Sequence, residues 1–333
     1  EAALLRSKIH RRRGETAKAD EALSYVPAKL GKGLGTALFY VNNGHPEKAI
    51  DEASAALGQT PHDAGLRAVK GAAHLMLGER QDCINEWSKA LEIEPDRLSR
   101  YQDLARVLAQ DRSPQDVEKA LRSIGAARPN LVNMTMGWVY ERVGDARRAI
   151  EAYSDILASR TATDSERRQA RFARARLLGK LGQTDAACRE LDTLADRQHW
   201  RRRALSEKVR VLLRARRGDE AEAVLAKLGT IAREENDPVL LNQIGTVWTQ
   251  AGRLDKALAV ARQAQELYPH DARAHLLEAT VHSGRNDRSA ALEALNRAIE
   301  LQPGNHEYYV IRSRLLRASN RPRAAIEALD ALV

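Results

Sequence analysis

Two consecutive stretches of this chain follow one pattern: residues 237–269 read DPVLLNQIGTVWTQAGRLDKALAVARQAQELYP, and residues 270–303 read HDARAHLLEATVHSGRNDRSAALEALNRAIELQP. Three residue pairs mark the repeat at a shift of 34 residues: Gly252 with Asn286, Ala257 with Ala291, and Pro269 with Pro303. In each stretch, two apolar segments of helical spacing flank a Gly or Asn turn, which is typical of a helix–turn–helix unit. The spacing therefore predicts an all-α repeat protein.

The composition of the chain favours the same fold class. Aromatic residues make up 4% of the 333 residues, whereas Ala, Leu, Glu and Arg dominate, so we expect no β-strand. A repeat array can reach this length because each unit packs only on its neighbours. No apolar run approaches the roughly 18 residues of a membrane helix, and no signal-peptide pattern is present, so we expect neither feature in this segment.

The ends of the chain and its cysteines leave the compartment open. Glu1 and Val333 both fall inside predicted helices, so we interpret the chain as a segment truncated at both ends, and its Ala, Leu and Arg richness indicates a larger bacterial protein. Cys83 and Cys188 are interpreted as small buried thiols, three repeats apart. Both a cytoplasmic and a periplasmic location agree with these features.

Ten predicted turns divide residues 1–333 into ten helix pairs. The turn markers are Gly14, Gly44, Gly78, Arg112, Gly144, Gly182, Gly218, Gly252, Asn286 and Asn320. Gly or Asn suits this place because the residue that follows a helix commonly takes a positive φ. The spacing lengthens to 38 and then 36 residues after Gly144, and we expect the insertions in connectors near residues 161–165 and 198–200.

Two further positions recur relative to the turn. Five residues after it comes a compact residue, as expected where two helices approach closely: Ala19, Ala49, Cys83, Val117, Ala149, Ala187, Ala223, Ala257, Ala291 and Ala325. Seventeen residues after it, a proline is predicted to end the second helix in five units: Pro61, Pro95, Pro129, Pro269 and Pro303. Proline has this effect because it cannot continue the helical hydrogen bonds.

The pattern of Gly245, Trp248, Ala257 and Pro269 resembles the tetratricopeptide repeat family, and the fifth unit repeats it in part. This resemblance covers essentially the whole chain and implies a right-handed superhelical solenoid of antiparallel helix pairs, forming one array from residue 1 to residue 333. It also implies a protein-binding scaffold. The closing proline is missing from the first, fifth, sixth and seventh units.

No catalytic or metal-binding constellation is predicted. His10, His74 and His282 each lie four residues before a turn, where the resemblance implies a large packing side chain, so we interpret them as packing residues. The glycines at 31–35 lack the Gly-Lys-Ser/Thr ending of a phosphate-binding loop. We therefore expect no enzyme activity, no cofactor and no metal.

Positive charge is concentrated in one block of the chain. Residues 165–217 contain 16 Lys and Arg against 6 Asp and Glu, whereas the whole chain has a net charge of +9. Such a block attracts anions, although it is equally compatible with a solvated surface.

The resemblance implies that the first helices line a concave groove through residues about ten, six, three and two before the turn. On that rule, the predicted groove set comprises Arg106, Met134, Trp138, Phe172, Arg176, Lys180, Lys208 and Arg216. Aromatic rings among cations suit a binding surface, because rings give contact area and Arg gives directed hydrogen bonds.

The sequence favours a scaffold that binds a peptide, helix or folded protein in this groove, with anionic segments preferred near residues 165–217. One alternative is binding of an anionic polymer, either nucleic acid or polysaccharide. We consider nucleic acid the weaker option, because a nucleic-acid solenoid would spread its basic residues over many repeats. Another alternative is a structural tether in a bacterial envelope or polysaccharide-secretion assembly, which is an analogy at the level of the fold.

Overall fold

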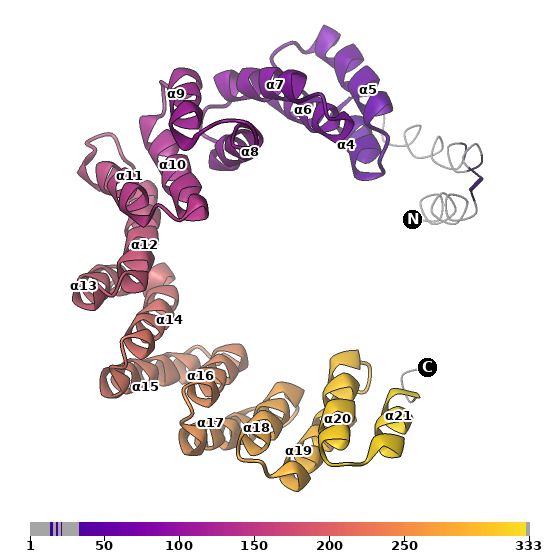
Figure 1. Cartoon of the computed structure of the whole chain (residues 1–333), viewed down its shortest axis with the longest axis vertical. Helices are drawn as coiled ribbons and strands as arrows, with labels where there is room; N and C mark the ends of the chain where they lie inside the picture. The colour runs from indigo at the N-terminus through magenta and orange to yellow at the C-terminus, as the bar shows by residue number, and fades with distance from the viewer. Residues whose placement is uncertain (1–13, 16–17, 19–20, 22–32, 331–333) are drawn as a thin grey trace. The chain divides into compact units, whose positions relative to one another are not determined.

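The computed structural model describes residues 14, 15, 18, 21 and 33–330 of the chain (Figure 1). Within these residues every regular element is a helix, which confirms the predicted all-α fold class. The first predicted helix pair, with Ala19 and His10, lies outside the described residues. The chain divides into two compact units, Glu1–Arg174 and Ala175–Val333, and the boundary falls within helix α12 (Asp164–Lys180).

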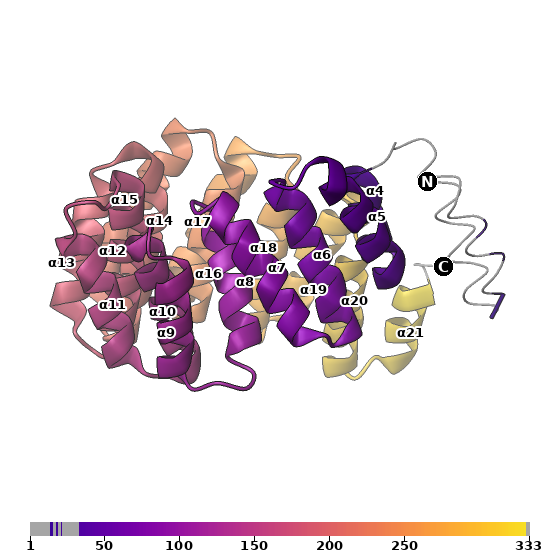
Figure 2. The ribbon, with the colours of Figure 1, turned by 90° about the horizontal axis from the view of Figure 1, so that it is seen from above.

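The first unit consists of consecutive antiparallel helix pairs. Its complete helices are α4 (Leu34–Asn42), α5 (Pro46–Gln59), α6 (Ala64–Leu77), α7 (Arg80–Ile93), α8 (Leu98–Leu108), α9 (Pro114–Ile124), α10 (Pro129–Val143) and α11 (Ala146–Ala158). Each helix packs against the next along the chain, and first helices also contact each other directly, as α4 and α6 do side by side in Figure 2.

The second unit repeats this plan. Beyond α12 it contains α13 (Thr184–Ala195), α14 (Gln198–Arg214), α15 (Gly218–Glu234), α16 (Pro238–Gln250), α17 (Leu254–Leu267), α18 (Ala272–Gly284), α19 (Arg288–Leu301), α20 (His306–Ala318) and α21 (Pro322–Asp330). Within this unit the first helices α16 and α18 lie together on one side, and the second helices α17 and α19 lie on the other (Figure 1). Both units are therefore stacks of two-helix repeats.

Local sequence signals start several of these helices. Pro46 and Pro114 occupy the first turn of their helices, where a missing N–H is harmless. Thr163 and Glu166 form a reciprocal capping box, because each backbone N–H donates to the side chain of the other residue, at 2.7 and 3.2 Å. The prediction for Pro129 was wrong, since this residue begins α10, whereas α9 has already ended at Ile124.

Turn geometry follows the predicted markers with two exceptions. Positive φ occurs at Gly14, Gly44, Gly78, Gly144, Gly182, Gly252, Asn286 and Asn320. Arg112 is not a positive-φ residue, because the chain after α8 continues in right-handed turns, with the Asp111 N–H donating to the Leu108 carbonyl. In the seventh repeat, positive φ falls on Arg216 (59°), and the predicted marker Gly218 instead begins α15.

The compact residue of the seventh repeat shifts by the same two residues. Ala221 is completely buried, whereas the predicted Ala223 is exposed. At the other predicted positions within residues 33–330, the compact residue is at most 3% exposed. The second helix of this repeat thus begins two residues earlier than the sequence suggested.

The extra residues of the longer repeats extend helices rather than connectors. Helices α12, α14 and α15 each contain 17 residues, and residues 198–200 belong to the first turn of α14. The second predicted insertion site was therefore wrong, because Trp200 is helical and the Arg203 guanidinium lies 5.1 Å from its ring centre.

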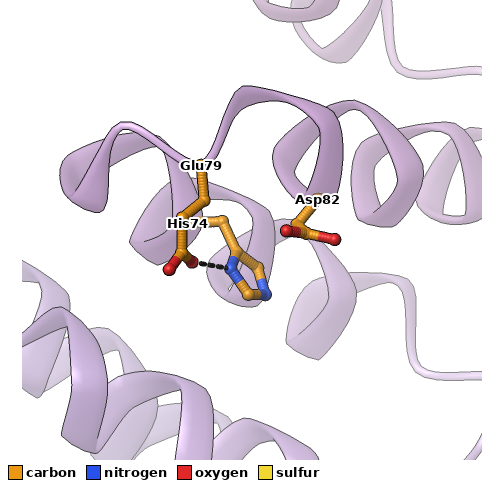
Figure 3. Close-up of side chains that lie close together, drawn as sticks. All are labelled: His74, Glu79 and Asp82. Atoms are coloured by element: carbon orange, nitrogen blue, oxygen red, sulfur yellow. Dashed lines mark hydrogen bonds and ion pairs between the residues drawn. The ribbon is translucent and has the colours of Figure 1, made fainter.

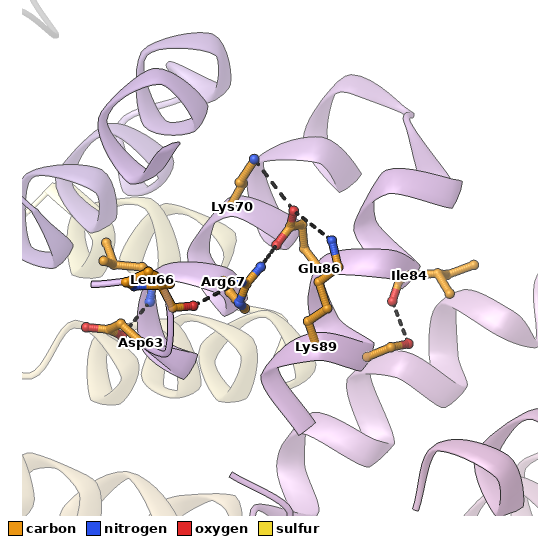
Figure 4. A network of polar contacts seen from close by, with 9 residues as sticks. Asp63, Leu66, Arg67, Lys70, Ile84, Glu86 and Lys89 are labelled. Atoms are coloured by element: carbon orange, nitrogen blue, oxygen red, sulfur yellow. Dashed lines mark hydrogen bonds and ion pairs between the residues drawn. The ribbon is translucent and has the colours of Figure 1, made fainter. Parts of the chain in front are cut away.

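Close approach and a polar network hold the third repeat together. Gly71 on α6 leaves room for the Trp87 ring, whose Nε1–H donates to the Ala68 carbonyl at 2.9 Å. Glu86 on α7 accepts from Arg67 at 3.1 Å and lies 3.6 Å from the Lys70 ammonium (Figure 4). The carboxylate is 11% exposed and its main partners about 20%, so these charges join α6 to α7 with little solvent screening.

Candidate binding groove

A large cavity opens on the first helices of the second unit. Its volume is about 1140 Å³, and its walls come mainly from α14, α16 and α18, with α15 beneath them. We call it the α14–α16–α18 cavity. Its apolar surface includes Leu213, Val247 and Leu276. A concave surface of this size, largely apolar with a few polar groups, is the usual form of a ligand site.

The charged residues around the α14–α16–α18 cavity are all cations. They are Arg210, Arg214, Arg216, Arg253 and Arg273. No Asp or Glu belongs to the lining among the described residues. The wall therefore offers guanidinium groups, which bind carboxylates through two parallel hydrogen bonds.

Only part of this positive charge is neutralised within the protein. Arg210 lies 3.0 Å from Glu207, and Arg273 lies 2.8 Å from Asp271. Within residues 33–330, Arg214, Arg216 and Arg253 have no carboxylate oxygen inside 4.0 Å. These three follow or end the first helices α14 and α16, so the uncompensated charge lies at the turn end of the cavity.

A polar group on the cavity wall also lacks a protein partner. The Asn242 amide donates from Nδ2 to the Pro238 carbonyl at 2.9 Å. Its Oδ1 atom is buried and, among the described residues, accepts no hydrogen bond. An unsatisfied buried acceptor of this kind is destabilising.

The corrected turn of the seventh repeat explains why α14 lines the cavity. Counting ten, six, three and two residues back from Arg216 gives Ser206, Arg210, Leu213 and Arg214, and all four line the cavity. The same counts from Gly252 include Asn242, Thr246 and Gln250, which also line it. Counting from the incorrect marker Gly218 gave Lys208 instead.

In the first unit, the structure places four residues of the predicted groove set on first helices. Arg106 is exposed on α8 and lies 3.2 Å from Asp103. Trp138 is partly exposed, and the Arg142 guanidinium lies 5.1 Å from its ring centre. Met134 and Phe172 are only 6% and 7% exposed, which leaves little of either side chain for a partner. Trp138 is thus the aromatic residue of this set with substantial exposed surface.

The remaining four predicted residues lie in the second unit. Arg176 is partly buried and Lys180 is exposed, both on α12. Lys208 points to the side of α13, because its ammonium contacts both carboxylate oxygens of Asp192 at 2.7 Å. Among the described residues that line the α14–α16–α18 cavity, Arg216 is the single member of the predicted set.

The sequence analysis did not identify one cluster of side chains that could hold a metal ion. His74, at the end of α6, lies beside Glu79 and Asp82 at the start of α7, with its Nδ1 atom 2.6 Å from the Glu79 carboxylate (Figure 3). We call these three residues the His74 cluster. They converge because the turn at Gly78 reverses the chain, which spacing within one helix does not reveal.

Comparison with family models gives one match, within the second unit. A family model described as tetratricopeptide repeat matches residues 249–315. No curated protein matches the chain. Within residues 33–330, no helix combines the length and the apolar character needed to span a bilayer.

Several solved structures align with this chain at low identity. Yeast Tom70 aligns over 98% of this chain and 90% of its own, with 14% identity and a TM-score of 0.39. Naa15/Naa10 bound to HypK-THB aligns over 99% of this chain and 68% of its own, with 15% identity and a TM-score of 0.33. MamA from Desulfovibrio magneticus RS-1 aligns over 62% of this chain and 93% of its own, with 15% identity and a TM-score of 0.30. Such values do not identify a function. The tetratricopeptide repeat model thus matches residues 249–315, and the rest of residues 33–330 consists of consecutive helix pairs on the same plan.

Proposed function

We propose that the chain is a protein-interaction scaffold that binds an acidic, partly apolar protein segment in the α14–α16–α18 cavity. The coarse part of this assignment follows from the repeat type, because tetratricopeptide repeat proteins are generally interaction scaffolds and typically non-catalytic. We extend the proposal to the absence of enzyme activity in this chain.

The single observation that supports this site best is that every charged residue of its wall is positive. Five arginines and no carboxylate line the cavity, and three of the arginines lack an acidic partner in the described part of the chain. An acidic segment can place its carboxylates on Arg214 and Arg253, while an apolar side chain contacts Leu213 and Leu276.

The repeat architecture favours binding because the walls are formed before the partner arrives. Gly245 on α16 allows α18 to pack so closely that a Cβ atom here would overlap the Leu277 side chain. Trp248 is 6% exposed and sits beneath the Lys256 ammonium at 5.1 Å from its ring centre. A wall held in shape in this way reduces the ordering cost of association.

The predicted groove set remains a proposal for further contacts of the partner. Trp138 with Arg106 in the first unit offers a partly exposed ring and a cation. The other members are Met134, Phe172, Arg176, Lys180, Lys208 and Arg216.

Binding of an anionic polymer is the second candidate. The basic block of residues 165–217 favours it, but at least six of the 16 cations lie within 4.0 Å of a carboxylate. Local pairing reduces the field that a polyanion would experience. Polymer binding would show an affinity whose logarithm falls steeply with the logarithm of the salt concentration, with little sequence preference. The tether interpretation predicts no specific ligand in the cavity.

A peptide selection tests the proposal. Short random peptides displayed on phage are selected on the full chain, and one enriched peptide is synthesised with a fluorescent label for anisotropy measurements. We expect enrichment of Asp and Glu beside Leu, Ile or Phe. The double variant Arg214→Glu, Arg253→Glu should weaken binding at least about 10-fold, because the loss of even one close charge pair at the low end of the range, about 1.5 kcal/mol, corresponds to that factor.

Arg262→Glu is the matched control. This arginine is exposed on α17 in the same unit, outside the cavity, and its reversal changes the net charge with the same sign. Binding should stay within about twofold of the parent chain, since surface charges are largely screened. Equal weakening by the control and the double variant, or unchanged binding in both, would contradict the proposed site.

A further inference from the structure

We propose that the His74 cluster is a binding site for a divalent transition-metal ion of the zinc class. The His74 imidazole, the Glu79 carboxylate and the Asp82 carboxylate each offer one ligand atom, and these atoms lie within 4.8 Å of one another (Figure 3). The site belongs to the third repeat of the first unit and is independent of the α14–α16–α18 cavity.

The strongest argument is a comparison with other repeats of the same chain. In the fifth repeat, the Arg148 guanidinium lies 5.7 Å from the centre of the Tyr140 ring, and in the eighth the Lys256 ammonium lies 5.1 Å from that of Trp248. The cation follows the ring by eight residues in both cases. In the third repeat the same two positions hold His74 and Asp82. An aromatic ring under a cation has thus been replaced by an imidazole beside a carboxylate.

This replacement changes the chemistry of the position from packing to ligation. An aromatic ring and a cation attract each other directly, with no bound ion between them. An imidazole with two carboxylates instead presents one nitrogen and two oxygen ligands, a set that zinc and similar ions accept, with water in the remaining position. The two carboxylates also supply the charge of −2 that compensates a divalent cation.

The geometry is close to that of a bound site. Zinc bonds of about 2.0–2.2 Å place tetrahedral ligand atoms about 3.3 Å apart. The Nδ1 atom of His74 and the Glu79 oxygen are 2.6 Å apart, so this pair must open slightly. The Asp82 ligand atom lies within 4.8 Å of the other two and must come to tetrahedral spacing. The side chain of Asp82 is exposed at the start of α7 and can move in this way. The His74 side chain is 14% exposed, so packing fixes the ring.

Two positive features oppose a cation here, and neither occupies the site. Arg80 lies next to Glu79 in the chain, but its guanidinium contacts Asp111 of the following repeat at 2.5 Å. The N-terminus of α7 carries a partial positive charge of about half a unit, less than the two carboxylates supply. The ninth repeat provides a natural contrast, because His282 lies 3.7 Å from Asp287 but Ala290 occupies the place of Asp82.

Titration of the metal-free chain with Zn²⁺ alone tests the proposal. Isothermal titration calorimetry should show one saturable Zn²⁺ site per chain, with Mg²⁺ and Ca²⁺ failing to compete, since an imidazole nitrogen favours softer ions. Asp82→Lys should remove this site. The variant recreates the ring-and-cation arrangement of the eighth repeat, so it should keep the circular dichroism spectrum and the melting temperature of the metal-free parent.

The control variant is His282→Tyr, which removes a histidine at the equivalent place of another repeat. It should retain the Zn²⁺ site with unchanged stoichiometry, and Co²⁺ substituted for Zn²⁺ should show visible absorption of a tetrahedral ion that Asp82→Lys abolishes. Zn²⁺ binding that survives in Asp82→Lys would overturn the proposal. The absence of a saturable site in the parent chain would also overturn it. Loss of the site in the control variant would do the same, because adventitious ions on surface histidines would then account for the data.

Discussion

Substitution of Gly71 by alanine tests how closely the two helices of one repeat approach. A Cβ atom at Gly71 would stand 2.5 Å from Nε1 of Trp87 and closer still to Cδ1. The indole ring is rigid, so it must move by about 1 Å, and overpacking of this kind costs about 1–3 kcal/mol. The movement also weakens the hydrogen bond to Ala68, worth about 1 kcal/mol. Removal of a helical glycine returns about 1 kcal/mol. We therefore expect a net loss of about 1–3 kcal/mol.

Gly229→Ala provides the opposite case. This glycine lies inside α15, and a Cβ atom added to it would meet no heavy atom within 4 Å, so alanine should stabilise the helix by about 0.5–1 kcal/mol. Because repeat arrays unfold in parts, the assay is native-state hydrogen exchange, which reports the opening free energy of each helix separately. Slower or unchanged amide hydrogen exchange of α7 in the Gly71→Ala variant would refute this reasoning. So would stability changes of the same sign in the two variants.

Three further predictions concern particular side chains. Glu86→Ala removes the carboxylate shared by Arg67 and Lys70, whose side chains are about 20% exposed, and should lower the free energy of unfolding by urea by about 1–3 kcal/mol. Lys89→Ala changes an exposed side chain and should alter this free energy by at most about 0.5 kcal/mol. Ala221→Leu should lower the melting temperature strongly, while Ala223→Leu should leave it nearly unchanged, because only the former residue is buried. Burial, aided by a nearby carboxylate, raises the pKa of Cys83 from its usual 9.0 to about 12. The raised pKa means that the protonated thiol contributes fully to the stability of the folded chain below pH 9, and that this contribution declines as the pH rises toward 12. A thiol reagent at pH 8 should therefore modify Cys83 only when the chain unfolds.

The sequence predicted those features of the fold that depend on local chemistry. Helix pairs, their N-terminal caps and most turns follow from signals within a few residues. Ser113, for example, accepts the Asp116 N–H at the start of α9, because a helix start is determined by the first turn alone. The buried compact residues were predictable for the same reason, since each lies a fixed distance from its turn.

The seventh repeat shows where local signals fail. Gly218 could adopt a positive φ without steric strain, yet the residue with the positive φ is Arg216. For a residue with a side chain, such as Arg, this conformation costs free energy. The burial of Ala221 against neighbouring helices overrides that preference, and such long-range packing is not visible in one repeat of sequence. The two-residue error moved the predicted groove from Arg210 and Arg214 to Lys208.

The choice of site also depended on contacts that spacing does not reveal. The sequence located a basic block, but it could not show which cations pair with acids. Lys208 contacts Asp192, whereas Arg214 has no such partner within the described chain. The lining residues of α16 are neutral or apolar and carry no charge signal, so their convergence with those of α14 and α18 becomes apparent only in three dimensions.

Site-directed photocrosslinking tests the central claim, which is that the first-helix face of the second unit binds the partner. A benzophenone amino acid replaces Thr246 on α16, at the cavity wall, or Arg262 on α17, outside it. The selected acidic peptide is then irradiated with each full-length variant. We predict that it crosslinks at position 246 and not at position 262, and that excess unlabelled peptide abolishes the product. Crosslinking at position 262 alone, or equally at both positions, would contradict the account.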